Sequence, residues 1–204
     1  DFEADAVNVN VAAGVAIGAG IAVIDVLPDI TTFIGNADVT TTNGDVVVES
    51  THSNNLDVVA TAAGIGVLAA GAAGAVAIAD GSSRQNTYIA SGATISSGDD
   101  VRLSSVLNND VATDTVGIGG GVSGQGVSIA LSRIGGRAWT HLNDVTVHAD
   151  GDVIVKSDVD ADADVETVAV AGGVISGQIN SADALVNTDI EAYVADFATI
   201  DAGG

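Results

Sequence analysis

The sequence has 204 residues, of which 47% are hydrophobic but only 3% aromatic, and it contains neither Cys nor Met. A disulfide framework is therefore excluded, and any core must be built from Val, Ile, Ala and closely packed backbone. With 27 acidic and 5 basic residues the formal net charge is −22, which argues against nucleic acid as a partner. Val, Ile and Thr favour strands, and 26 Gly with a single Pro favour turns and close backbone approaches. The composition predicts an all-β chain.

One pattern recurs along the chain. Each copy runs through a Gly/Ala/Val-rich strand, an aromatic residue and a turn, and then enters a short strand. These last blocks read "GDVVVES" at 44–50, "DDVRLSS" at 99–105 and "GDVIVKS" at 151–157. Their aspartates at 45, 100 and 152 are 55 and 52 residues apart. A period of this length indicates a solenoid or a similar stacked array, in which each unit buries its apolar face against its neighbours.

The repeats define one array over residues 1–204, with a period of about 51–55 residues and approximate units 1–50, 51–105, 106–157 and 158–204, the last incomplete. This period is longer than the ~20–30 residues of a one-coil repeat, so we expect two coils, or a coil plus a hairpin, in each unit. The Gly/Ala arms have apolar residues at both parities, which predicts strands that are buried on both faces or stacked inside a coil. The predicted fold is a parallel β-solenoid.

The second Gly/Ala arm, residues 58–79, is a run of 22 uncharged residues and has the length of a membrane helix. Gly is costly in helices, and the equivalent arm of the last copy contains Gln178, Asn180 and Asp183. The repeat register therefore favours a strand pair over a membrane span.

The order of these motifs resembles a known family. A Gly/Ala/Val strand is followed by "AY" or "AW", then by "GATI" or "ADVT", then by "GDVxVxS", over the whole chain. This pattern is similar to the repeat region of large secreted bacterial proteins of the leukotoxin-like filamentous adhesins, related in style to haemagglutinin-type proteins. The resemblance implies an elongated extracellular β-solenoid at a bacterial cell surface, serving as a stalk, adhesin or fibre.

A run of alternating aspartates, "SDVDADADVE", gives the one candidate metal site. Asp158, Asp160, Asp162 and Asp164 lie on one face if the segment is a strand. Several carboxylates side by side suit Ca²⁺, which takes oxygen ligands. The alternative is a solvated acidic face that prevents lateral aggregation, and this interpretation is favoured over the metal site.

The aromatic residues of the four copies, Phe33, Tyr88, Trp139 and Tyr193, are 55, 51 and 54 residues apart. This spacing predicts an aromatic ladder running from coil to coil, either buried as rungs or exposed as a binding stripe. The buried form is favoured because stacked rings would stabilise a core with few large side chains.

No catalytic or cofactor site is predicted. The glycines at 119, 121 and 124 match G-x-G-x-x-G but are followed by a strand pattern instead of a helix. We expect a structural or adhesive protein, with a β-helical polysaccharide lyase or hydrolase as the alternative. Neither end of the array shows a polar cap, so we expect either that the chain is an excerpt of a longer array or that its ends join other chains. In the second case copies associate end to end or through edge strands into fibres, which contact other cells or surfaces.

Overall fold

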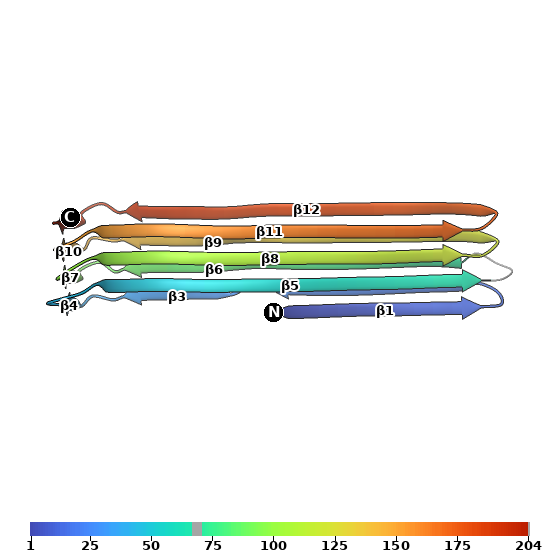
Figure 1. Ribbon diagram of the computed structural model, residues 1–204, viewed down its shortest axis with the longest axis horizontal. Helices are drawn as coiled ribbons and strands as arrows, with labels where there is room; N and C mark the ends of the chain where they lie inside the picture. The colour runs from blue at the N-terminus through green and yellow to red at the C-terminus, as the bar shows by residue number, and fades with distance from the viewer. Residues whose placement is uncertain (67–70, 204) are drawn as a thin grey trace.

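The computed structural model describes residues 1–66 and 71–203. Every described element is a strand and every described strand pairing is parallel, in three sheets (Figure 1). The front sheet comprises β1 (Phe2–Ala12), β5 (Val46–Gly66), β8 (Val101–Gly120) and β11 (Val153–Gly172). The back sheet comprises β2 (Ala16–Val26), β3 (Asp29–Ile34), β6 (Gly71–Ile89), β9 (Ser123–Leu142) and β12 (Ile175–Val194). The end sheet comprises β4 (Asp38–Thr40), β7 (Thr94–Ser97), β10 (Thr146–Ala149) and β13 (Thr199–Ala202). The prediction of an all-β parallel solenoid is confirmed.

Each repeat makes a single coil. The chain runs along a front strand, returns along a back strand and crosses the end sheet before the next front strand begins (Figure 1). Val46 pairs with Val101 and Val101 with Val153, so the sequence period reappears as strand register. The expectation of two coils, or a coil plus a hairpin, in each unit is wrong. The long strands of complete coils have 19 to 21 residues, which at ~3.3 Å per residue makes a coil roughly 65 Å wide.

The core lies between the front and back sheets, and it is thickest beside the end sheet. Side chains alternate between this interior and solvent, as the burial of β8 shows at every second residue. The cluster next to the end sheet contains large, fully buried side chains such as Leu103, Ile95 and Leu142. Three sheets surround this region, which leaves room for Leu and Ile.

The opposite end of each coil, which we call the tip, is thin because front and back backbones approach each other there. A Cβ atom built on Gly126 of β9 would lie 2.5 Å from the carbonyl oxygen of Val170, on the facing β11. Gly18 of β2 shows the same 2.5 Å approach to the Ala63 oxygen. Gly and Ala are therefore needed at inward positions of the tip. Of the two predicted arrangements of these arms, burial on both faces is wrong, because outward residues such as Ile65 remain exposed.

Between the tip and the thick end, the interior carries polar side chains that bond from coil to coil. Asn54 Nδ2 donates to Asn109 Oδ1 at 3.0 Å and to Ser83 Oγ at 2.8 Å. One coil further, Ala161 occupies the register position of Asn109, and the Asn109 Nδ2 has no hydrogen-bond partner. The row of hydrogen-bonded Asn side chains therefore ends at Asn109, because the next coil has Ala161 in place of Asn.

Residues 58–66 and 71–79 form the end of β5 and the start of β6, while 67–70 lie outside the described residues. The strand prediction for this arm is confirmed over the described part. In the part of the chain that the structure describes, no helix has the length and apolar character to cross a membrane.

Candidate functional site

The repeated aspartates stand where the chain leaves the end sheet and enters the front sheet. The backbone N–H of Asp100 donates to Asp45 Oδ1 at 3.3 Å, and that of Asp152 donates to Asp100 Oδ1 at 2.8 Å. Each carboxylate therefore holds the equivalent residue of the next coil. This bond from Asp152, and secondly the Arg102 side chain, keeps the pKa of Asp100 below its usual value. The Asp of the recurring "DV" motif therefore has a structural role, because it links the turns of successive coils.

The same turn contains the geometry of a possible cation site. Ligand oxygens of Asp45, Asp99 and Asp100 all lie within 4.8 Å of one another, and a hard cation prefers such oxygen donors. Arg102, however, already pairs with two of these carboxylates, at 3.5 Å to Asp45 and 2.5 Å to Asp100. The guanidinium supplies the positive charge that a metal ion would bring.

The alternating aspartates of β11 lie on the outer face of the front sheet. Asp158 pairs with Lys156, while Asp160, Asp162 and Asp164 are exposed. They stand two residues apart along an extended strand and are absent from the group of converging ligand atoms at the turn. Their place on one face follows from the alternation, and a Ca²⁺ role for them stays a prediction.

Other acidic residues share this outer face. Asp114 of β8 pairs in register with Glu166. Burial, and then the nearby charges of Glu166, Asp57 and Asp164, raise the pKa of Asp114 above its usual value. The outer face of the front sheet thus concentrates negative charge.

An aromatic ladder crosses the outer face of the back sheet. Phe33 stacks on Tyr88 with ring centroids 5.2 Å apart and planes within 8°. Tyr88 stacks on His141 at 5.2 Å, and His141 on Tyr193 at 5.0 Å, with planes within 5°. The rings come from β3, β6, β9 and β12, so each coil contributes one rung.

The prediction of Trp139 as the third rung is wrong, because His141 takes that place. Trp139 lies one outward position earlier on β9 and pairs in register with Asn86 and Glu191. The other three predicted residues do belong to the ladder. The sequence spacing could have identified His141 as the third rung. His141 is 53 residues after Tyr88, which equals the sequence offset between paired residues of β6 and β9, whereas Trp139 is 51 residues after Tyr88.

The ladder is also not a set of buried core rungs, since its side chains point away from the interior. Their chain neighbours Thr87 and Leu142 are fully buried inside the coil. Stacking nevertheless covers the ring faces, and His141 is only 6% exposed. Its Nδ1 has no hydrogen-bond partner, and burial lowers the pKa of His141, with Glu191 opposing part of this effect.

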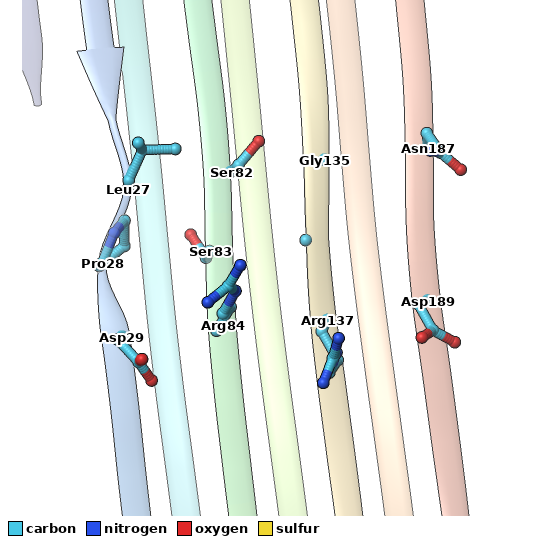
Figure 2. Close-up of a pocket in the computed structure, with 11 residues that line it drawn as sticks. Leu27, Pro28, Asp29, Ser82, Ser83, Arg84, Gly135, Arg137, Asn187 and Asp189 are labelled. Atoms are coloured by element: carbon cyan, nitrogen blue, oxygen red, sulfur yellow. The ribbon is translucent and has the colours of Figure 1, made fainter.

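A groove of about 510 Å³ crosses the same outer face, at the level of the break between β2 and β3 (Figure 2). Pro28 has no N–H to donate and interrupts this edge of the sheet, although its carbonyl oxygen accepts the Arg84 N–H at 2.8 Å. Ser82 and Gly135 pair in register across the groove, so small residues form part of its lining.

The next row of outward residues carries charge. Arg84 and Arg137 pair in register on adjacent strands, and Asp29 and Asp189 flank them on β3 and β12 (Figure 2). The Arg137 guanidinium lies over the Trp139 ring, 3.9 Å from its centroid. The groove is not apparent from the sequence, although register alignment of residues 84 and 137 brings the two arginines together.

Comparison of the chain with models of known protein families, with curated proteins and with solved structures finds no significant match.

Proposed function

We propose that this chain is a structural and adhesive module of an extracellular filament or stalk on a bacterial cell, built for reach and surface contact, with no catalytic role. The order of its repeat motifs, which resembles that of filamentous adhesins, supports the extracellular location. The parallel stack of wide coils supports the structural role, because such an array grows in one direction by adding further coils.

The observation that carries the proposal is the inward face of β12, which the described coils leave uncovered. Val186 and Val194 of β12 point toward the interior, yet each is 47% exposed. The residues in the same register one coil below, Ile134 and Leu142, are 1% and 0% exposed. Covering such apolar area stabilises a stack by about 25 cal/mol per Å². In the filament that we propose, a further coil of the same kind covers this face.

Charge opposes this association. Copies that each carry a formal charge of −22 repel one another, and salt screens the repulsion. Stacking is therefore expected to strengthen as the ionic strength rises, which separates it from an assembly held by ion pairs.

Sedimentation velocity of two matched variants tests the proposal. Val186→Asp places a charge on the uncovered core, whereas Leu185→Asp places it on the outer face of the same strand, where the side chain is 51% exposed. We expect the parent chain and Leu185→Asp to form larger species as concentration and salt increase, and Val186→Asp to remain small. Equal association of both variants, or a parent chain that stays monomeric throughout, would contradict the proposal.

A further inference from the structure

The few cations of this acidic chain are divided between two environments. Of the five basic residues, Arg102 and Lys156 form ion pairs with aspartates on the front-sheet side. The other three take part in no ion pair among the described residues. All three point outward from the back sheet, from the paired strands β6 and β9: Arg84, Arg133 and Arg137. Among the described residues, the basic side chains without an ion pair thus lie on one face, and Arg84 and Arg137 line the groove.

The groove keeps space beside the arginines because its lining residues are small. Gly135 has no side chain, and a Cβ atom built there would meet Ser82 Oγ at 2.7 Å. The row that contains Arg84 and Arg137 borders this space, and parallel neighbours place their Cα atoms about 4.8 Å apart. Two like charges on neighbouring strands repel each other, so an anion placed between them would remove an unfavourable interaction.

The acidic residues of the groove lie beside the arginines without forming ion pairs with them. Asp29 and Asp189 lie on the strands next to Arg84 and Arg137, but neither forms an ion pair within 4.0 Å among the described residues. Arg137 instead stacks over Trp139, which fixes the plane of its guanidinium and leaves its N–H donors for another acceptor. Both guanidinium groups are therefore available to a ligand.

We propose that this groove binds an acidic polysaccharide through its carboxylate or sulfate groups, with Arg84 and Arg137 as the anion-binding pair. The inference rests on the proposed adhesive function and names the chemistry of the surface that is bound. The lining includes Ser, Asn and Asp side chains, which suit sugar hydroxyls, and these residues come from the neighbouring strands of successive coils.

Binding to immobilised polygalacturonate, dextran sulfate and neutral dextran tests the inference. The groove variant is Arg84→Gln with Arg137→Gln, and the matched control is Arg102→Gln with Lys156→Gln, which changes the net charge equally. Because the substitutions remove the charged donors of the hydrogen bonds to the anion, the groove variant should lose at least about tenfold in affinity. The control should stay within about twofold of the parent chain, and Asp29→Asn with Asp189→Asn should bind more tightly.

The outcomes distinguish carboxylate from sulfate ligands, and they distinguish failure of the groove site from failure of the filament. Binding to polygalacturonate alone assigns the site to carboxylates, and binding to dextran sulfate alone assigns it to sulfates. Equal losses in the groove and control variants, or a parent chain that binds neither polymer, would overturn the inference. Sedimentation of the same groove variant reports on stacking independently, because the substituted residues lie away from the uncovered core. Stacking without binding refutes the groove site alone, and binding without stacking refutes the filament alone.

Discussion

Because the coil narrows toward its tip, we predict that alanine substitutions of two glycines there differ in their effect on stability. Replacing Gly126 by Ala puts a methyl group into the tip, where the Val170 oxygen must move from 2.5 Å to at least 3.4 Å away. The Gly117 oxygen, 2.9 Å from the same Cβ position, must move as well. Overpacking of this kind costs about 1–3 kcal/mol. The lower entropy of the unfolded alanine chain returns about 0.4–1 kcal/mol, so we expect Gly126→Ala to lower the free energy of unfolding by about 1–2 kcal/mol.

Gly120 provides the control from the same region. It lies at the end of β8, and its built Cβ comes no nearer than 3.8 Å to another residue. Gly120→Ala is therefore expected to be neutral or to stabilise by up to about 1 kcal/mol. Guanidinium denaturation followed by circular dichroism measures both variants. If the two substitutions have the same effect, the close approach of the sheets at the tip is refuted.

Further predictions concern the ladder, the turn and pH. Tyr88→Ala removes two stacked contacts and Phe33→Ala one; at about 0.5–1.5 kcal/mol each, thermal unfolding should show the larger loss for Tyr88, and equal losses would count against the ladder. Because burial lowers the pKa of His141, protonation favours the unfolded chain, so stability should fall as the pH drops below about 6.5. His141→Phe should reduce this loss, and an unchanged pH profile of the melting temperature would refute the assignment. Arg102→Ala should raise the pKa of Asp100, and added Ca²⁺ should then stabilise the variant more than the parent chain. If Ca²⁺ changes the melting temperature of both proteins equally, Arg102 does not occupy a cation position.

The fold was largely predictable because repeat period and strand register are the same quantity in a parallel solenoid. The spacing of 55 and 52 residues between the "DV" blocks equals the offset between paired strands. The size of a coil was not predictable from the period alone. A repeat of this length is consistent with several coil shapes, and only the meeting of front and back backbones at the tip shows that each repeat closes once.

The sites were less predictable, because they depend on small register shifts and on what neighbouring strands supply. Tyr88, Tyr193 and Phe33 were identified from residue type, but His141 was not recognised as a rung because it is not a typical aromatic core residue. The aspartates at 45, 100 and 152 were recognised as a repeated pattern, whereas their bond to the next coil is seen only in the structure. The arginine pair was missed because Arg84 and Arg137 are 53 residues apart and belong to segments that do not otherwise look alike.

Cryo-electron microscopy of the concentrated chain at about 0.5 M salt, where repulsion between acidic copies is screened to within a few ångströms, tests the central claim most directly. We predict filaments whose axis is perpendicular to the strands, with coils spaced about 4.8 Å apart along that axis and with flat, wide cross-sections. Particles that remain single and compact at every concentration and salt level would contradict the account of this chain as a stacking structural module.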